Sequence, residues 1–517
     1  QLSAIGFGFA WFFSPFIGYL ISQDYREESV EMTEQQKQHL RMIARKTWRF
    51  FEEFMNEKNH YLPPDNYQTD PPRGVAYRTS PTNIGLGLLS VLSARDFGFI
   101  STTEMVDRLE KTIATIDSIE KWNGHLPNWI DTRTLKPLHP IYISTVDSGN
   151  LLSYLITLKE GLKDYLQKPL VELNMLQSLR DTLYCAGDEG IQCTEDMMLC
   201  FTFPIIEPIS LGSWQDIMDQ LESYPAFDEM KQGHWKSKVM AMVQMLHQDF
   251  HDHYPPMELF RNIPLDLRES KVPPKIVEMV KQLRSDCEKN HALEDFPAIY
   301  ETSIRDIETM EKILHKEGYQ NLQEGITWLT TLKNHLVESH TQMLQLIERI
   351  HNLLDCIERI ADTMDFVPLY SKRKQLFSIG YAMDSQKRTP SFYDLLASEA
   401  RQTSYVCIAK GIVPATHWFR MDRTLTTVDG YKGLISWTGT MFEYLMPLLI
   451  MKKYKHSLLD ESYAFALRCQ MKYAKQRNMP WGSSESAFYS LDKNHDYQYK
   501  AIGIPWLGLK RGLVKDA

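Results

Sequence analysis

The sequence predicts an all-α fold in which helices pack in concentric rings, with loops at one end forming a site. Apolar residues recur at helical spacing through most of the chain, whereas strand-like alternation is rare. Loops rich in glycine, proline and aromatic residues separate the helical segments. The length of 517 residues exceeds an ordinary small domain but suits a helical barrel. Other large all-α folds give the same periodicity, so the pattern alone favours the ring arrangement without excluding them.

The helices expected from this periodicity follow one another along both ends of the chain. Residues 31–56 place Leu40, Ile43, Trp48 and Phe51 at helical spacing. An irregular loop follows at residues 63–74, where prolines cluster. Further helices are expected at residues 82–97, 104–121, 146–163, 394–410, 439–451 and 459–476. In the first of these, glycines at positions 85 and 87 indicate close packing.

The middle of the chain, residues 205–365, differs in character because it is polar, rich in methionine and poor in glycine. Apolar residues from 326 to 364 follow a heptad seam, which Lys333 and His340 interrupt. This pattern predicts one long helix, or a helical hairpin with an earlier partner. We expect a hairpin inserted into the barrel; a coiled-coil contact between two copies is the alternative.

The chain begins with an apolar stretch, residues 2–22, that carries no charge and has about the length of a membrane span. A membrane-proximal segment is therefore expected, and a helix docked on the protein's own surface is the alternative. The predicted organisation is a membrane-proximal segment at 1–24, a first part of the barrel at 25–204, a helical insertion at 205–365 and a second part of the barrel at 366–517.

Composition excludes several classes of function. The net charge of -9 and the lack of a basic stripe argue against a nucleic-acid surface, so no nucleic-acid partner is expected. The 7 cysteines are scattered without CxxC spacing, which indicates free thiols in a reducing compartment. His247 and His251 lie four apart, but the zincin pattern needs a glutamate where Gln248 stands. We therefore expect neither a metal nor an organic cofactor.

Two carboxylates in the last third of the chain are the main catalytic candidates. Glu399 and Glu485 each lie next to small side chains, where a ligand can approach closely. Aromatic residues nearby offer flat faces to sugar rings. Paired carboxylates with aromatic platforms indicate chemistry on glycosidic bonds.

Several loops combine hydrogen-bonding groups with aromatic rings, as binding of sugar hydroxyls and ring faces requires. Capping of helix ends is the alternative explanation for any one of them. The substrate-binding candidates are Tyr77, Arg78, Thr79, Asn83, His125, Asn128, Trp129, Asp147, Lys374, Tyr381, Trp418, Arg420, Trp437, Thr438, Glu443, Trp481, Ser484, Tyr489, Tyr499 and Lys500.

At these positions the chain resembles the middle domain of cyclic β-1,2-glucan synthases. The strings that carry the resemblance are YRTSPTNIGLGLLS, GHLPNWIDTRTLKPLHPIYISTVDSGNL, LFSIGY, FYDLLASEAR, HWFR, WTGTMFEYLMP and WGSSESAFY. The resemblance spans residue 46 to about 165 and residues 364 to 513, with weaker support between them. It implies an (α/α)6 barrel similar to β-1,2-glucanases.

The resemblance also implies partners and a location. In that family a membrane-embedded glycosyltransferase domain, which uses UDP-glucose, precedes this domain, and a phosphorylase-like domain follows it. The apolar start then resembles the last membrane segment of the transferase portion. The implied partner is a linear β-1,2-glucan chain, and the implied location is the cytoplasmic side of the inner membrane.

The implied activity is transglycosylation that closes linear β-1,2-glucan into rings. Carried over by motif, Glu485 is the nucleophile and Glu399 the acid/base, with Glu443 as a rival for either role. Retention of the β configuration requires two displacements and a glycosyl-enzyme. A buried ion pair of Glu399 with Arg401 or Arg420 is the structural alternative. An inverting endo-β-1,2-glucanase and a non-catalytic module that holds glucan are the alternative functions.

Overall fold

The computed structural model describes residues 2–22, 31–186, 209–222, 233–268, 272–316, 319, 322–493 and 495–509. The chain forms two compact units, Gln1–Ala44 and Arg45–Ala517. The first unit holds α1 (Leu2–Ser22) and the start of α2 (Glu34–Phe54), and Phe7 and Trp11 of α1 are exposed. No helix in the described ranges combines the length and apolar character that crossing a membrane requires. Membrane attachment through residues 1–24 stays a prediction.

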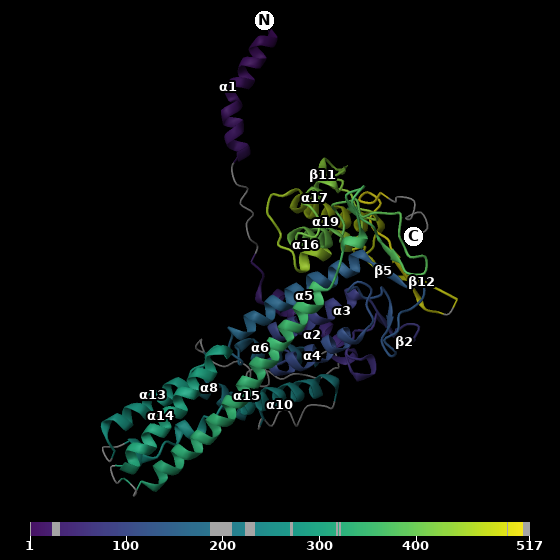
Figure 1. The fold of residues 1–517 in the computed structure, drawn as a ribbon. Helices are drawn as coiled ribbons and strands as arrows, with labels where there is room; N and C mark the ends of the chain where they lie inside the picture. Colours follow the sequence, from purple (N-terminus) through teal and green to yellow (C-terminus); the bar gives the residue numbers. More distant parts are fainter. Residues whose placement is uncertain are drawn as a thin grey trace. The chain divides into compact units, whose positions relative to one another are not determined.

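A group of packed helices forms the body of the second unit (Figure 1). It contains α3 (Pro81–Asp96), α4 (Thr102–Ser118), α5 (Thr145–Leu166) and α6 (Leu173–Ala186). Ser80 caps α3 by accepting a hydrogen bond from the backbone N–H of Asn83, 3.1 Å away. Helix α3 packs on α5, and a Cβ at Gly85 would come within 2.4 Å of the Tyr154 ring. The close packing expected at this glycine is confirmed.

The middle region forms a second set of helices. They are α8 (Leu211–Glu222), α10 (His234–His253), α11 (Glu258–Arg261), α12 (Leu265–Arg268), α13 (Pro274–Glu288), α14 (Phe296–Lys316) and α15 (Gln323–Asp362). Helices α13 and α14 and one end of α15 extend away from α3 and α4 in Figure 1.

The heptad seam of the middle region forms the single 40-residue helix α15. Leu336, Met343 and Ile350, which repeat every seven residues, are fully buried. Helix α15 packs along α14 at one end and along α4 and α5 at the other. Lys333, which interrupts the seam, pairs with Glu311 of α14 at 2.6 Å. The predicted long helix with an earlier partner is confirmed, and Lys333 is paired within the chain.

The last third of the chain combines short helices with antiparallel hairpins. Its helices are α16 (Arg401–Ala409), α17 (Thr416–Arg420), α18 (Met441–Leu445) and α19 (Leu458–Arg477). Its hairpins pair β10 (Leu425–Val428) with β11 (Tyr431–Leu434) and β12 (Glu485–Leu491) with β13 (Tyr497–Ala501). An apolar cluster that includes Leu434, Tyr444, Phe465, Cys469 and Ile504 holds these elements together.

The remaining strands have only two or three residues each. They are β1 (Tyr67–Gln68), β2 (Gly74–Val75), β3 (Arg78–Thr79), β4 (Ile130–Asp131), β5 (Tyr142–Ser144), β6 (Tyr370–Ser371), β7 (Leu376–Phe377), β8 (Gly380–Ala382) and β9 (Lys387–Arg388). One-turn 3₁₀ helices occur at Glu57–Asn59, Leu293–Asp295, Val367–Leu369 and Met446–Leu449. The named strands pair antiparallel in sheets of two or three. The mostly helical class is therefore confirmed, whereas the (α/α)6 arrangement stays a prediction.

Two helices expected near the candidate site were wrong in their extent. The helix expected at 394–410 begins only at Arg401, because the preceding backbone pairs with Asp422: Leu396 N–H donates to its carbonyl at 3.1 Å. The helix expected at 439–451 is only α18 followed by a 3₁₀ turn. That turn contains Pro447, which lacks the N–H that an α-helix needs. The hairpin β12–β13 was not foreseen.

Candidate active site

Glu399 lies in the turn that precedes α16, and α16 packs against α5. This contact brings the Glu399 carboxyl near Asp147 and Asn150 of α5. Burial raises the pKa of Glu399 well above its usual value, and the negative charges of Asp147 and Glu485 raise it further. A hydrogen bond from the Asn150 amide opposes this shift. Glu399 is thus favoured in its protonated form, as a proton donor requires.

A chain of hydrogen bonds orders the α5 side of the site. The Thr82 hydroxyl of α3 donates to Asp147 Oδ1 at 2.6 Å, and Asn150 Nδ2 donates to that hydroxyl at 3.1 Å. Gln402 Nε2 of α16 then donates to Asn150 Oδ1 at 3.2 Å. Burial raises the pKa of Asp147. The three helices therefore hold Asp147 and Asn150 in fixed positions beside Glu399.

Glu485 is the first residue of β12, and the base of this hairpin is anchored. Ser484 Oγ accepts from the Phe442 N–H at 3.1 Å. The Tyr499 hydroxyl of β13 donates a hydrogen bond to Glu485 Oε2. Burial raises the pKa of Glu485, whereas this hydrogen bond lowers it. The pKa of Glu485 is raised overall, but the Tyr499 hydroxyl is a donor that favours its anion, whereas the pKa of Glu399 is raised further by burial and by neighbouring negative charges. Such divergent environments suit a nucleophile and an acid/base.

Neither arginine considered as an ion-pair partner of Glu399 has that role. Arg401 is buried, and its guanidinium donates to the carbonyls of Ser398 and Tyr444 and to the hydroxyl of Tyr463. Arg420 is exposed and donates to the side chain of Gln375 at 2.8 Å. These contacts argue against the structural alternative for Glu399.

Glu443 is buried in the first turn of α18, and its carboxylate accepts many hydrogen bonds from the loop that precedes this helix. Its donors are the backbone N–H groups of Trp437, Thr438, Gly439 and Thr440 and the hydroxyls of Ser436, Thr438 and Thr440. Thr440 and Glu443 also form a capping box. These bonds occupy the oxygen lone pairs, so Glu443 organises the loop that supports Trp437 and Thr438.

Tyrosines near the carboxyl groups were missed by the sequence analysis. Burial raises the pKa of Tyr393 well above its usual value, and the charges of Glu399, Asp147 and Glu485 contribute. Tyr154 of α5 is buried, and burial together with Glu399 and Asp147 raises its pKa. Tyr393 belongs to the same sequence string as Glu399, and Tyr154 lies seven residues, or two helical turns, after Asp147. That spacing was the available signal.

Of the candidates just before and at the start of α3, two contact Asp65. Arg78 pairs with Asp65 at 2.9 Å, and Asn83 Nδ2 approaches the same carboxylate at 3.4 Å. Tyr77 is exposed, whereas the Thr79 side chain is fully buried. Asn83, which follows Thr82, is thus placed beside the Asp147 network, and Arg78 is connected to Asn83 through Asp65, but Thr79 faces the interior.

The candidates at residues 125–129 separate into a buried and an exposed part. His125 is fully buried and its Nε2 lies 2.8 Å from the Asp365 carbonyl oxygen, so it packs the core. The Asn128 backbone N–H donates to the Tyr142 carbonyl at 2.7 Å. The Trp129 ring is exposed, and the Arg78 guanidinium lies 5.3 Å from its centre. Trp129 is therefore available as a sugar platform, whereas His125 is not.

Four further candidates have no described contact with the catalytic candidates Glu399 and Glu485. Lys374 and Arg420 are exposed, Tyr381 stacks on Trp122 at 4.4 Å, and Trp418 packs against the apolar cluster of the last third. No described contact joins these four to the carboxyl groups.

Candidates that follow in the last third lie closer to Glu485. Trp481 is exposed four residues before Glu485. Lys500 pairs with Ser486 in the β12–β13 register. The Tyr489 side chain lies outside the described residues.

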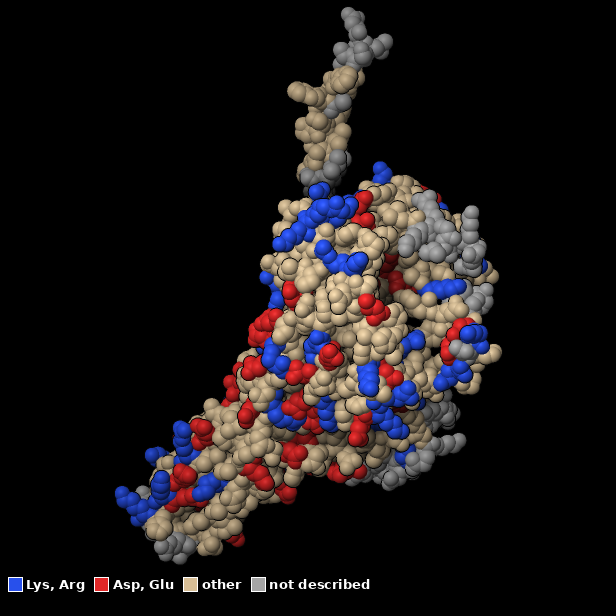
Figure 2. All heavy atoms as spheres, turned by 45° about the vertical axis from the view of Figure 1, so that its right-hand side comes forward, with Lys and Arg blue, Asp and Glu red and all other residues tan. Residues whose placement is uncertain are grey.

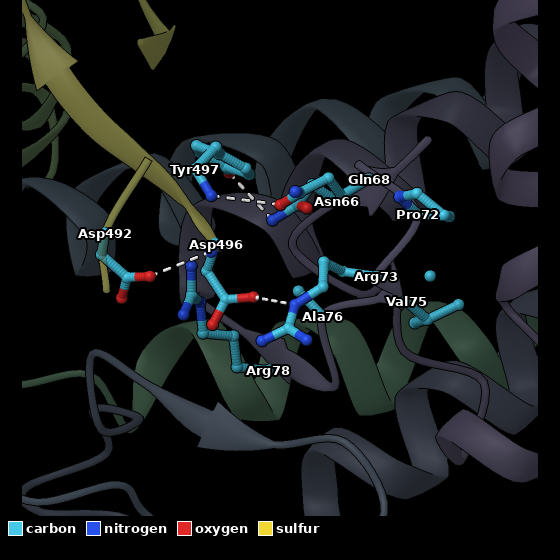
Figure 3. Close-up of a pocket in the computed structure, with 11 residues that line it drawn as sticks. Asn66, Gln68, Pro72, Arg73, Val75, Ala76, Arg78, Asp492, Asp496 and Tyr497 are labelled. Carbon is cyan, nitrogen blue, oxygen red and sulfur yellow. Dashed lines mark hydrogen bonds and ion pairs between the residues drawn. The ribbon is translucent and has the colours of Figure 1, made fainter. Parts of the chain in front are cut away.

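A polar cavity of about 520 Å³ adjoins the far end of the β12–β13 hairpin (Figure 3). Its lining includes Asn66, Gln68, Arg73, Asp496 and Tyr497. Figure 2 shows a recess on one face of the molecule in which acidic side chains are visible.

Two sequence comparisons found similarity to known proteins, one to a family model and one to a curated relative. A family model described as "Protein of unknown function (DUF3131)" matches residues 42–186. The chain is 32% identical over 520 residues, its whole length, to cyclic beta-(1,2)-glucan synthase NdvB of Rhizobium meliloti (strain 1021). It covers 16% of the length of that protein. The resemblance to a segment of a cyclic β-1,2-glucan synthase is thereby confirmed.

Among the solved structures that are similar to this chain is an endo-beta-1,2-glucanase from Chitinophaga pinensis in complex with sophorotriose and glucose. The TM-score is 0.47 at 11% identity, covering 93% of this chain and 76% of that chain. A likeness at this level does not establish a common fold.

Proposed function

We propose that this chain is a transglycosylase domain that closes linear β-1,2-glucan into rings with retention of the anomeric configuration. The observation that carries the proposal is the pair Glu399 and Glu485: the negative charge of Glu485 contributes to the raised pKa of the buried Glu399, and the Tyr499 hydroxyl donates a hydrogen bond to Glu485. The similarity to a segment of a cyclic β-1,2-glucan synthase supports the choice of substrate.

The proposed reaction has two displacements. In the first, a Glu485 oxygen bonds to the anomeric carbon, the glycosidic C–O bond breaks, and Glu399 supplies the proton to the leaving oxygen. In the second, a hydroxyl near the non-reducing end of the same chain attacks that carbon. Glu399 takes back the proton and Glu485 leaves. The proton can pass directly between Glu399 and the glycosidic oxygen or through a substrate hydroxyl. Both routes move the same single proton in each displacement.

The proposed setting is one domain of a larger glucan synthase. The chain covers 16% of the synthase that it resembles, which leaves room there for other domains. We propose a glycosyltransferase domain and a phosphorylase-like domain as neighbours, membrane attachment through the N-terminal segment, and a location on the cytoplasmic side of the inner membrane.

The test is incubation of the chain with purified linear β-1,2-glucan, followed by mass spectrometry and NMR of the products. Rings lack one water relative to linear chains of equal length, and the new linkages should keep the β configuration. Linear products with an inverted anomer would instead identify a hydrolase. Binding without any product would identify a module that only holds glucan.

A further inference from the structure

A short segment, residues 65–68, contacts both halves of the candidate active site. On one side Asp65 accepts hydrogen bonds from Arg78 at 2.9 Å and from Asn83 at 3.4 Å. Asn83 directly follows Thr82, whose hydroxyl donates to Asp147. This side of the segment is therefore tied to the helices that surround Glu399.

The other side of the segment contacts the β12–β13 hairpin, as Figure 3 shows. Asn66 Nδ2 donates to the Tyr497 hydroxyl at 2.8 Å, and Gln68 Oε1 accepts from the Tyr497 N–H at 3.1 Å. Gln68 Nε2 also donates to the His495 carbonyl at 2.9 Å. The chain continues to Arg73, which pairs with Asp496 at 2.9 Å. Residues more than 420 positions apart in sequence are thus joined at the tip of the hairpin.

Strand β13 connects this contact to Glu485. Tyr497 and Tyr499 are two residues apart, so they share one face of the strand about 7 Å from each other. Tyr497 is held by Asn66 and Gln68, whereas the Tyr499 hydroxyl donates to Glu485. A shift of Tyr497 along or across the strand would therefore displace the donor of the nucleophile.

The cavity beside these contacts is less suitable as a second sugar-binding site than as a contact between two segments. Its amide, guanidinium and carboxylate groups are bonded to one another across the two segments, as at Asn66–Tyr497 and Arg73–Asp496. Polar groups already paired in this way give little net energy to a new ligand, because binding must first break their bonds. We therefore call the contacts of Asn66 and Gln68 with His495 and Tyr497 the brace, because they hold two segments together.

We infer that Asn66 and Gln68 are positioning residues, which fix the β12–β13 hairpin so that Tyr499 and Glu485 lie correctly relative to Glu399. The inference rests on the proposed function, because it assigns these residues a part in the same reaction. It makes the separation of the two catalytic carboxyl groups depend on a segment that touches neither of them. That separation governs the outcome of glycosidase chemistry.

The first test is Gln68→Ala in the whole chain. Loss of the brace should lower kcat by on the order of tenfold to a hundredfold, because small misplacements of reacting groups have effects of this size. KM for linear glucan should change by no more than about twofold, since the inference gives Gln68 a positioning role and no contact with the substrate. The matched control is Gln282→Ala, whose amide bonds only to Asp286 on the exposed side of α13. An unchanged kcat in Gln68→Ala would overturn the inference.

A double-mutant cycle tests whether Gln68 acts through the Tyr499 contact. Tyr499→Phe removes the hydrogen bond to Glu485 directly. If the brace acts by placing that hydroxyl, Gln68→Ala should have less than about half its usual effect on log kcat in the Tyr499→Phe background. Fully additive effects would overturn the inference, because they would mean that Gln68 acts by another route.

Hydrogen–deuterium exchange separates failure of the brace from failure of the proposed function. Amides of residues 485–501 should exchange faster in Gln68→Ala, and exchange in α19 should stay unchanged. This measurement needs no substrate. Faster exchange in a chain that forms no ring would reject the proposed function but keep the brace, whereas unaltered exchange would reject the brace.

Discussion

The loop around Glu443 and the turn around Glu399 each bury a glutamate, but they treat its carboxyl group differently. Glu443 accepts hydrogen bonds from four backbone N–H groups and three hydroxyls of its own loop. For Glu399, a hydrogen bond from the Asn150 amide opposes burial and the negative charges of Asp147, Glu485 and Glu443, all of which raise its pKa. Complete hydrogen bonding stabilises a loop, whereas an incompletely compensated carboxyl group is held ready for proton transfer.

This difference separates candidates that the sequence could not. In the sequence, Glu443 and Glu399 both lie among aromatic and small residues, and Glu443 rivalled either catalytic role. The hydrogen-bond partners favour Glu443 as a structural group, and Glu399 and Glu485 are the pair that we propose to react. Substitution of each glutamate by glutamine tests the comparison directly, because the shape is kept while the charge is lost.

Glu485→Gln should have the largest effect. Removal of the nucleophile prevents the glycosyl-enzyme from forming, so kcat for ring formation should fall by at least about 10³-fold. Binding of linear glucan, measured by calorimetry, should persist because the amide retains the shape of the side chain. Near-normal turnover in this variant would contradict the assignment of the nucleophile.

Glu399→Gln should have the next largest effect, and the effect should depend on the leaving group. With linear glucan, kcat should fall by about 10²–10⁴-fold because the leaving oxygen is no longer protonated. With an aryl glycoside whose leaving group needs no protonation, part of the first step should return as a burst of released phenol. Equal losses with both donors would argue that Glu399 is not the acid.

Glu443→Gln should affect stability more than chemistry. The amide presents N–H groups to donors that previously bonded to a carboxylate, so the free energy of unfolding should fall by about 2–4 kcal/mol. Urea denaturation measures this loss. The rate per folded molecule should stay within about threefold of the unmodified chain, well above that of Glu399→Gln. A catalytic collapse in a stably folded Glu443→Gln would reverse the comparison.

The sequence predicted the long helices of this arrangement well, but it did not predict the local structure that depends on contacts distant in sequence. Periodicity found the long helix α15 because its apolar residues repeat without interruption by proline. It placed Glu399 inside a helix because Asp394–Arg401 has helical composition, whereas pairing of the preceding backbone with Asp422, distant in sequence, decided the local structure. The Tyr499–Glu485 bond depends on strand pairing that periodicity did not reveal. His125 looked like a ligand in its polar loop, but it is buried in the core.

The pH dependence of stability offers a smaller but independent measure of the environment of Glu399. Burial raises its pKa in the folded chain above the unfolded value of about 4.3. The folded state therefore holds the proton more tightly, and the associated stability is present below pH ~4 and lost as pH rises toward the folded pKa. Glutamine does not titrate, so Glu399→Gln should gain stability over the unmodified chain between pH 4 and 7.

Urea denaturation at a series of pH values checks this expectation. The control is Glu160→Gln, because Glu160 is exposed on α5 and pairs with Lys163 at the surface. Its difference from the unmodified chain should stay nearly constant over the same pH range. A gain for Glu399→Gln that does not grow with pH would mean that Glu399 is not held in a proton-favouring environment.

The smallest expected effects come from the aromatic platforms, which extend the comparison from the carboxyl groups to the surface around them. Trp129 and Trp481 are 37% and 55% exposed, so each ring can lose water on contact with a sugar face. Trp129→Ala, Trp481→Ala and Trp437→Ala should each weaken binding of long linear glucan by about 1 kcal/mol, or about fivefold in KM. Short donors should be affected less if the rings contact distant glucose units.

Tyr454→Ala, at an exposed ring between α18 and α19, is the control for loss of an aromatic side chain. Unaltered KM for long glucan in all three tryptophan variants would show that these rings do not bind the substrate, and would restrict the site to the surroundings of Glu399 and Glu485.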